Sequence, residues 1–155
     1  MPCFHAPAVV IRSVSAAAST ANQDLFKQLG VDQPIDYTTT KFEDVVKDVD
    51  VVLNAVRGDT LARSYSVVKK GGIIVSITGQ PDPGELEKHG IRGVGLSAHP
   101  DAKVLEELAN LIDAGKITPI VSPVMPLVDV AKAQEQIASR HTRGKIVLKI
   151  AEPPK

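Results

Sequence analysis

Two short polar turns are the segments of this chain best suited to hold a ligand. Asn54 to Gly58 and Ser76 to Gln80 each follow an apolar run that predicts a buried strand, and a predicted helix joins the two runs. Two strands joined by a helix form a βαβ unit, and ligands of open parallel sheets bind outside the carboxyl ends of the strands. Glycine at such a place lets the backbone approach a ligand closely. We therefore predict a binding site at these turns and assign no catalytic residue.

The histidines and the cysteine form no metal-binding pattern in the sequence. Cys3 is the single cysteine, and His5, His89 and His141 show no metal-ligand spacing with it or with a carboxylate cluster, so we predict no metal. His99 carries the side chain of an acid–base group. Its place before a proline at a strand end favours a solvated residue instead.

The elements that position the two turns alternate between strands and helices. Strands are predicted over residues 9–18, 34–37, 49–56, 73–78, 91–99 and 144–150, with short extended pieces at 117–121 and 124–127. Helices are predicted over residues 21–29, 42–46, 60–68, 85–89, 102–114 and 130–140. This alternation predicts an α/β fold with a mainly parallel sheet and flanking helices.

Residues at the predicted helix ends are typical of caps and stops. Thr20 and Gln23 have capping-box spacing, in which Gln23 would reach back to the helix start. Gly71 and Gly72 are predicted to end the helix over 60–68 and to precede the strand over 73–78. Aspartates precede three other predicted helices as N-caps, at positions 59, 101 and 129.

The composition is that of an ordinary soluble domain. At 155 residues the chain has the length of about one domain. Its formal net charge is zero and aromatic residues make up 3% of it, so we expect neither nucleic acid nor an anionic membrane as partner. No apolar run reaches the about 18 residues of a membrane span. The single cysteine fits a reducing compartment, and we predict a cytoplasmic protein.

Several short runs, in order and with matching spacing, carry a likeness to a known family. Together they resemble the medium-chain dehydrogenase/reductase superfamily, and within it the zinc-independent quinone oxidoreductase and alkenal reductase branch. The likeness covers residues 14–150. The runs are Ala18-Ser19-Thr20, Leu29-Gly30-Val31-Asp32, Ile35-Asp36-Tyr37, Asp50-Val51-Val52-Leu53, Gly71-Gly72-Ile73-Ile74-Val75-Ser76 and Arg143-Gly144-Lys145-Ile146-Val147-Leu148.

The resemblance implies a partial Rossmann-type NADP-binding domain over residues 14–116. Residues 117–150 correspond to a segment that packs on the catalytic domain in the family, residues 1–13 match nothing, and 151–155 are a tail. The catalytic domain, the first Rossmann strand, its glycine-rich turn and the following helix are absent from this sequence. A sheet without its first strand has a gap, which we expect to be filled by the N-terminal segment, with Ala8 to Val14 as a substitute strand, by dimerisation, or by a changed strand order.

The resemblance also implies which residues would face the cofactor. Ser19 and Thr20 would lie at the adenine ribose, where hydroxyls without an acid favour NADP over NAD. Simpler structural roles stay open: a helix cap for Thr20, packing for Tyr37, solvated turns after the strands, and a tight turn at Lys145. The other implied residues are Tyr37 and Asn54 at the adenine or ribose, Ser76, Thr78, Gly79, Leu96 and Ser97 along the nicotinamide, and Lys145 at a phosphate or ribose.

Three functions follow as hypotheses. The first is an NADPH-dependent quinone or enal reductase in truncated form, with NADP(H) binding weak or lost. The missing strand predicts that this form is a homo-oligomer. Its own hydride transfer is doubtful because the glycine-rich anchor for the pyrophosphate is missing. The second is a non-catalytic interaction or regulatory module on a Rossmann scaffold. The third is a flavodoxin-like α/β binding domain.

Overall fold

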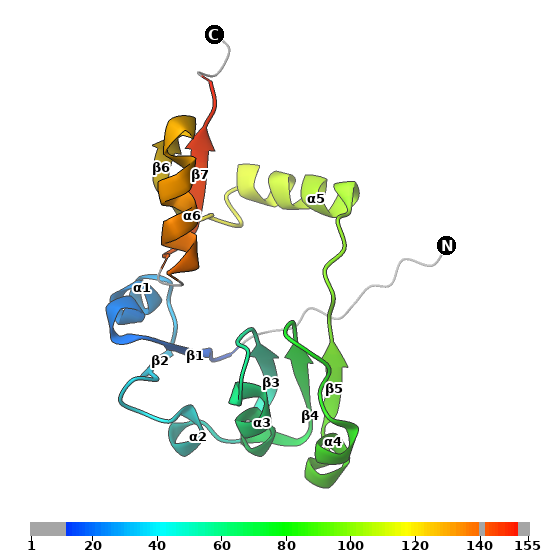
Figure 1. Ribbon diagram of the computed structural model, residues 1–155. Coiled ribbons are helices and arrows are strands. Elements are labelled where there is room, and N and C mark those ends of the chain that lie inside the picture. Colours follow the sequence, from blue (N-terminus) through cyan, green and yellow to red (C-terminus); the bar gives the residue numbers. More distant parts are fainter. Residues whose placement is uncertain (1–11, 140–141, 152–155) are drawn as a thin grey trace. The chain divides into compact units, whose positions relative to one another are not determined.

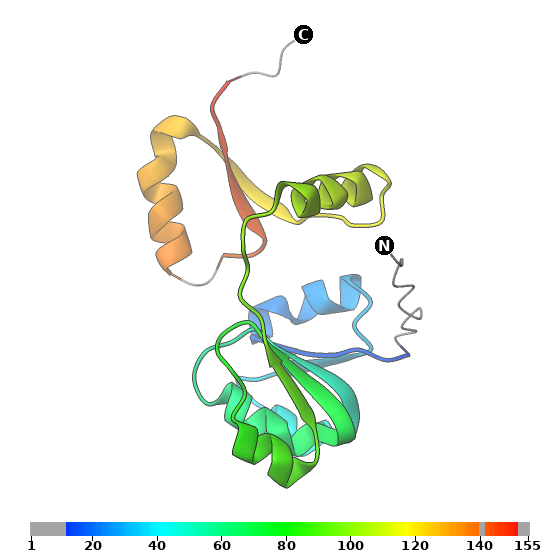
Figure 2. The same ribbon diagram turned by 90° about the vertical axis from the view of Figure 1, so that its right-hand side faces the viewer.

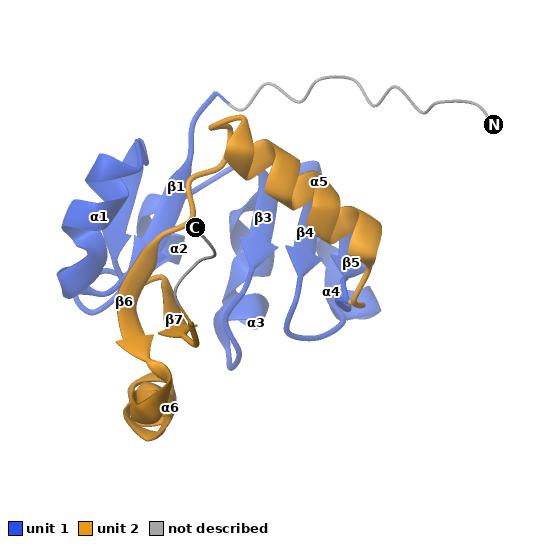
Figure 3. Cartoon of the chain, turned by 90° about the horizontal axis from the view of Figure 1, so that it is seen from above, with its two compact units in different colours: residues 1–98 blue, residues 99–155 orange. Residues whose placement is uncertain are grey.

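The computed structural model describes residues 12–139 and 142–151. The chain divides into two compact units, one up to Ala98 and one from His99 (Figure 3). Each unit is described by itself. Most of the N-terminal segment 1–13, and the start of the strand predicted over 9–18, lie outside the described residues. The boundaries predicted at residues 116 and 150 depend on cofactor binding and on packing against another domain. Nothing in this structure tests either property, so both boundaries stay predictions.

In residues 12–98, the described part of the first unit, there are five strands, all paired in parallel (Figure 1). Strands β1 (Ser15–Ala18) and β2 (Gln33–Asp36) form one sheet. Strands β3 (Val49–Asn54), β4 (Val68–Ser76) and β5 (Arg92–Gly95) form a second sheet in that order. The predicted α/β fold with a mainly parallel, Rossmann-like sheet is thereby confirmed.

Short helices connect these strands. Two of them, α3 and α4, pack on one face of the three-stranded sheet (Figure 2), where Leu61 and Leu86 contact a core of Tyr65, Val68, Ile74 and Ile91. The helical segments are η1 (Thr20–Asn22), α1 (Gln23–Gln28), α2 (Phe42–Val45), α3 (Thr60–Ser64), η2 (Tyr65–Val67) and α4 (Pro83–His89).

No strand pairing joins the two sheets of the first unit within the described residues. Ile35 of β2 instead packs with Val46 and Val67 in a second apolar cluster, against which Val49 and Val52 of β3 also lie. Side-chain packing therefore holds the sheets in one unit, and the facing strand edges have no strand partner among residues 12–98. What completes the sheet stays a prediction, because Ala8 to Ile11 lie outside the described residues.

The second unit is a small parallel pair of strands with two helices. Helix α5 (Ala102–Asp113) is followed by β6 (Val121–Pro126), η3 (Leu127–Asp129), α6 (Val130–Ala138) and β7 (Lys145–Lys149). Strands β6 and β7 pair in parallel, as a βαβ unit requires. Its one buried apolar residue among those described is Ala133, so this unit has little core of its own.

Strand β4 begins at Val68, ahead of Gly71 and Gly72, so the prediction that these glycines end a helix is wrong. The helix predicted over 60–68 ends with α3 and the single turn η2. Gly71 has a φ of +80°, and a Cβ on Gly72 would lie 2.6 Å from Val68 Cγ1. The glycines therefore accommodate an irregularity inside the strand, where the register with β3 shifts.

Three side chains predicted to cap helices bind other groups instead, which corrects those predictions. A nearby polar or charged partner competes with the backbone N–H groups for the same oxygen atom. Asp101, by contrast, accepts from the Lys103 N–H at 2.8 Å and caps α5 as predicted. The observed partners are Asp36 for Thr20, Arg63 for Asp59 and Lys132 for Asp129.

Candidate functional site

A buried amide joins the two polar turns that follow β3 and β4. Asn54, at the end of β3, is 2% exposed, and Ser76, at the end of β4, is 0% exposed. Asn54 Nδ2 donates to Thr78 Oγ1 at 2.8 Å and to Ser76 Oγ at 3.3 Å. The parallel register pairs Asn54 with Ser76. Three of the predicted site residues are thus brought together at the carboxyl ends of neighbouring strands.

The orientation of the Asn54 amide follows from the hydrogen bonds of Thr78. Thr78 Oγ1 donates to the Val56 carbonyl at 3.4 Å, so the same oxygen accepts from the amide NH₂ of Asn54. Asn54 Oδ1 is then buried without a hydrogen-bond partner in the described part of the chain. An unsatisfied buried acceptor costs about 1–3 kcal/mol. A ligand that donates a hydrogen bond to Oδ1 would remove this cost.

The loop after β4 leaves space beside its backbone. A Cβ built on Gly79 would meet no atom within 4 Å. At Gly95, the end of β5, there is no such free space, because the Gln80 side chain occupies the position where a Cβ would lie. The Leu96 N–H donates to the Ser76 carbonyl at 2.8 Å, which holds predicted residue Leu96 beside this loop, and Ser97 follows it as an exposed residue.

A second polar cluster lies at the carboxyl ends of β1 and β2. The Thr20 hydroxyl donates to Asp36 Oδ2 at 2.6 Å, and the Thr38 hydroxyl donates to Asp36 Oδ1 at 2.6 Å. The Thr38 N–H donates to Asp36 Oδ1 at 2.9 Å. The hydrogen bonds from Thr20 and then Thr38 hold the pKa of the Asp36 carboxyl below its usual value. Asp36 is therefore a carboxylate near neutral pH.

The other predicted residues of this region surround that cluster. Ser19 Oγ accepts from Asn22 Nδ2 at 3.3 Å. The Tyr37 N–H donates to the Ala18 carbonyl at 3.1 Å, and the Tyr37 side chain is exposed rather than packed. Gln23 Nε2 donates to the carbonyls of Ala18 and Ile35, at 3.0 and 3.1 Å, and so ties the ends of the two strands together.

Asp36 and Gln23 are the residues of this cluster whose roles the sequence analysis missed. The prediction of hydroxyls without an acid considered the end of β1 alone. The acid comes from the neighbouring strand, since the register pairs Ala18 with Asp36. The signal was present in the run Ile35-Asp36-Tyr37, because polar residues at the ends of parallel neighbours meet at one edge of the sheet.

Lys145 is the predicted residue that lies in the second unit. It begins β7, its N–H donates to the Ile120 carbonyl at 2.8 Å, and its side chain is exposed. Gly144 before it has a φ of +71°, and a Cβ built on it would overlap the Ile120 carbonyl oxygen, so the chain bends sharply before the strand. This geometry accounts for the turn and leaves the Lys145 ammonium available to an anion.

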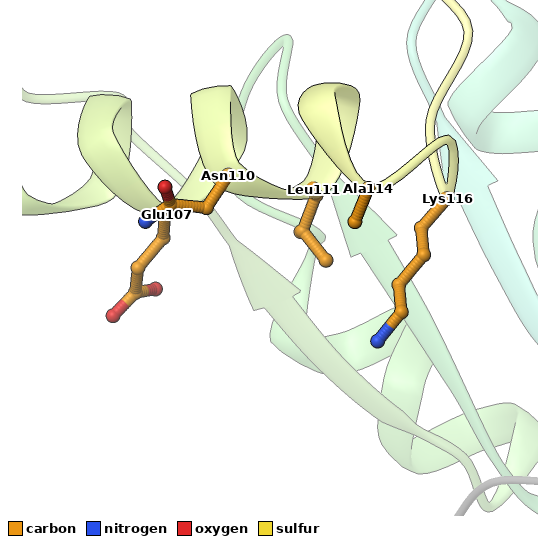
Figure 4. Close-up of a pocket in the computed structure, with 5 residues that line it drawn as sticks. All are labelled: Glu107, Asn110, Leu111, Ala114 and Lys116. Carbon is orange, nitrogen blue, oxygen red and sulfur yellow. The ribbon is translucent and has the colours of Figure 1, made fainter.

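A shallow hollow of about 340 Å³ lies along the carboxyl-terminal part of α5. Figure 4 shows its lining side chains on one helix and the residues directly after it. They do not converge on a strand end, and Glu107 and Lys116 offer opposite charges to the same space. The hollow is lined by Glu107, Asn110, Leu111, Ala114 and Lys116.

Across residues 12–139 and 142–151, no three His, Cys, Asp or Glu side chains gather as metal ligands. Over the same residues, no helix is both long and apolar enough to cross a bilayer.

Comparison with known proteins matches residues 29–148 to the family model described as zinc-binding dehydrogenase. The chain is 35% identical over 137 residues to a protein of Arabidopsis thaliana named NADPH-dependent alkenal/one oxidoreductase, chloroplastic. That match covers 87% of this chain and 33% of the relative. It is 28% identical over 146 residues to a probable zinc-binding oxidoreductase, mitochondrial, of Arthroderma benhamiae, covering 89% of this chain and 44% of the relative.

Among solved structures, the quinone oxidoreductase of Coxiella burnetii superimposes with a TM-score of 0.78 at 29% identity. The match covers 90% of this chain and 45% of that protein. The chain thus spans between a third and a half of the length of these three relatives.

Proposed function

The chain belongs to the zinc-binding dehydrogenase family, in the quinone and alkenal oxidoreductase branch of the medium-chain dehydrogenase/reductase superfamily, and from this premise we propose that it forms part of an NADP(H) site. The observation that carries the proposal is the buried network of Asn54, Ser76 and Thr78 with its unsatisfied Oδ1. The site lies where open parallel sheets bind ligands. The relatives named as NADPH-dependent alkenal and quinone oxidoreductases supply the reaction class.

The residues present fit the ribose and nicotinamide part of such a nucleotide. A ribose hydroxyl or a carboxamide N–H would donate to Asn54 Oδ1, the buried acceptor that lacks a donor. Gly79 leaves space for a ring to lie against its backbone. Leu96 and Ser97, beside the same loop, would complete this wall of the site.

On the adenosine side, the exposed Tyr37 ring would flank the adenine or its ribose, and Ser19 and Thr20 would lie at the ribose edge. The Asp36 carboxylate already binds the Thr20 hydroxyl proton, so Thr20 can accept a hydrogen bond from a ribose hydroxyl more readily than it can donate to a phosphate. Lys145 belongs to the second unit, and its role at a phosphate or ribose stays a prediction from the resemblance alone.

NADPH supplies a hydride for a quinone or an enal when it is bound in this branch of the superfamily. The residues of this chain would bind and orient the nucleotide. The sequence has no glycine-rich turn at a helix start, which is the usual anchor for a pyrophosphate. We therefore propose weak nucleotide binding and little hydride transfer by this chain alone, without a metal.

The experiment that tests the proposal is nucleotide binding measured by thermal shift and calorimetry with NADPH, NADH and FMN. We expect a shift with NADPH that Asn54→Leu abolishes. Asn110→Leu is the matched control, because Asn110 is exposed on α5 in the second unit. Oxidation of NADPH with a quinone or an enal is followed in parallel, and an appreciable rate would contradict the proposed lack of turnover.

The alternatives give other patterns in the same experiment. No shift with any nucleotide would support the non-catalytic interaction or regulatory module, and a shift with FMN alone would support a flavodoxin-like binding domain. Self-association is a separate proposal from the unpaired strand edges, and the mass in solution by light scattering tests it.

A further inference from the structure

The segment between β4 and α4, Ile77 to Asp82, is held at both ends by hydrogen bonds, and we call it the site loop. At its start, the Ile77 N–H donates to the Asn54 carbonyl at 3.0 Å. At its end, the Asp82 N–H donates to the Tyr65 hydroxyl at 2.7 Å. Gly79 lies between these two bonds, so they set the course of the backbone at the residue where a ligand ring has space.

The core of the first unit fixes the position of the Tyr65 hydroxyl. Tyr65 begins η2 and is 4% exposed. It belongs to the apolar cluster of Val68, Ile74 and Ile91. Its ring also stacks on the His89 ring, with the two centroids 6.2 Å apart. A buried tyrosine usually places its hydroxyl against a hydrogen-bond partner. Here that partner is the backbone of the site loop, so the bond ties the loop to the core.

The bond to Tyr65 also fixes the residue at which α4 begins. Asp82 is the N-cap of α4, and its Oδ1 accepts from the Glu85 N–H at 2.9 Å. Pro83, directly after it, has a φ restricted by its ring. The Asp82 N–H is thus held by the core, and its side chain is held by the helix. The far end of the site loop therefore has a defined position.

Two glycines of β5 receive the two side chains that follow Gly79. Gln80 occupies the space that a Cβ on Gly95 would need. Pro81 is buried, and its Cβ would lie 3.0 Å from a Cβ on Gly93. The second half of the site loop therefore packs on β5, while the backbone at Gly79 keeps free space beside it.

We propose that Tyr65 is a positioning residue of the nucleotide site, a role that rests on the proposed NADP(H) function. Its hydroxyl holds the far end of the site loop, and the loop presents the backbone of Gly79 to the nicotinamide ring. Tyr65 is buried in the core and acts through the loop rather than by touching the nucleotide. A loop held at one end samples more conformations, and ordering it on binding costs conformational entropy.

The test begins with Tyr65→Phe, which separates the hydroxyl from the ring. Phenylalanine keeps an aromatic ring in the apolar cluster and removes the acceptor for the Asp82 N–H. The matched control is Ile91→Val, which removes one methyl group from the same cluster. Its cost in stability is of the same order as that of one hydrogen bond. Ile91 takes part in neither hydrogen bond that holds the loop. We therefore expect both variants to lower the urea midpoint to a similar extent.

A second variant removes the donor of the same bond, should Tyr65→Phe fail to fold. Asp82→Pro has no N–H at this position, and the Asp82 φ of −71° suits proline. Asp82→Ala keeps the N–H and controls for the lost cap of α4. In the free chain we expect the Asp82 amide to exchange hydrogen more than about fivefold faster in Tyr65→Phe than in wild type. The Ile77 amide should exchange equally in the two.

Nucleotide affinity is measured by calorimetry on wild type and the two core variants. We expect Tyr65→Phe to weaken binding of NADPH by about three- to tenfold, and Ile91→Val to change it by less than about twofold. Adenosine 2′,5′-bisphosphate carries no nicotinamide and probes the adenosine end alone. It should bind Tyr65→Phe as it binds wild type.

The fluorescence of the nicotinamide ring gives a spectroscopic readout of the same site. Reduced nicotinamide is fluorescent and the chain contains no tryptophan, so the emission of bound NADPH reports on the surroundings of the ring. At saturation we expect a smaller change in emission with Tyr65→Phe than with wild type or Ile91→Val. A loss of general stability alone would not alter the emission of the saturated complex.

Several results would overturn the role of Tyr65. Wild-type affinity and emission in Tyr65→Phe would show that the hydroxyl does not position the loop, as would equal exchange of the Asp82 amide. Equal weakening by Ile91→Val, or weaker binding of the bisphosphate, would make the effect one of general stability. The proposed function fails by a different result: no binding of NADPH to wild type, or equal binding to Asn54→Leu. Binding that Asn54→Leu abolishes and Tyr65→Phe leaves unchanged would overturn the role of Tyr65 alone.

Discussion

Asn54 Nδ2 and Thr78 Oγ1 lie 2.8 Å apart and link the ends of two neighbouring parallel strands. Asn54 is 2% exposed, so for its amide NH₂ group this bond takes the place of a hydrogen bond to water. Asn54 and Thr78 lie 24 positions apart in the sequence, at the end of β3 and after β4. The link joins the two turns directly, beside the bond from Asn54 to Ser76.

Thr78→Val should destabilise the chain. The substitution keeps the side-chain shape and removes the acceptor for the Asn54 NH₂ group, which leaves a buried donor poorly satisfied. We expect a loss of about 1–3 kcal/mol in the free energy of unfolding. Urea titration with a linear extrapolation measures it, and Thr78→Ser should retain most of the wild-type stability. Equal midpoints for Val and Ser would show that the bond contributes nothing.

Gly72→Ala should destabilise the first unit, because the new Cβ would lie 2.6 Å from Val68 Cγ1 and 2.9 Å from the Asp50 carbonyl oxygen. Overpacking of this kind costs about 1–3 kcal/mol. Gly79→Ala is the matched control, since its Cβ meets nothing within 4 Å. The melting temperatures of both variants give the comparison, and a similar change in the two would contradict the close packing at Gly72.

The Asp36 cluster should make stability depend on acid pH. Hydrogen bonds from Thr20 and Thr38 lower the pKa of the Asp36 carboxyl in the folded chain below its ordinary value of 3.8. A lowered carboxyl pKa contributes stability above the unfolded value, and this contribution is lost as the pH falls through the folded value. We expect wild type to exceed Asp36→Asn in urea midpoint near neutral pH. The difference should shrink below pH 3.8, and a constant difference would count against it.

The same carboxylate should influence the choice between nucleotides. Asp36 places a negative charge beside Thr20, where the proposed site meets the adenine ribose. A 2′-phosphate would be repelled by it, while the diol of NADH would not. We expect Asp36→Asn to shift the ratio of affinities toward NADPH by about two- to fivefold at low salt. Calorimetry at two salt concentrations checks this, and an unchanged ratio would remove Asp36 from the site.

The strand ends of the site could be predicted from the sequence, and the partners of the side chains could not. The apolar runs before Asn54 and Ser76 fix both strands, and parallel pairing then brings their ends together. Asp36 escaped prediction because its role depends on the register of β1 against β2, which no local pattern encodes. The prediction that Gly71 and Gly72 end a helix was wrong for a related reason. Two glycines that can stop a helix also suit an irregular strand.

Two helix caps predicted from local sequence are also not formed by their side chains. Asp59 and Asp129 stand at the right positions to cap α3 and α6, and local sequence favours that role. In the folded chain Asp59 pairs with Arg63 at 3.3 Å, and Asp129 pairs with Lys132 at 2.7 Å. Lys132 lies in the first turn of α6, and Arg63 lies in the last turn of the short helix α3. Competition between two local partners for one carboxylate is decided by side-chain geometry.

Within residues 12–98, the side of β3 away from β4 has no strand partner, and this bears on how the chain would behave at high concentration. An unpaired edge with aliphatic side chains is a template on which further strands, including those of misfolded copies, can add. Solubility should then fall as the chain accumulates. Chaperones and proteases act on exposed edges of this kind, so the amount of the chain in a cell would depend on how well this edge is protected.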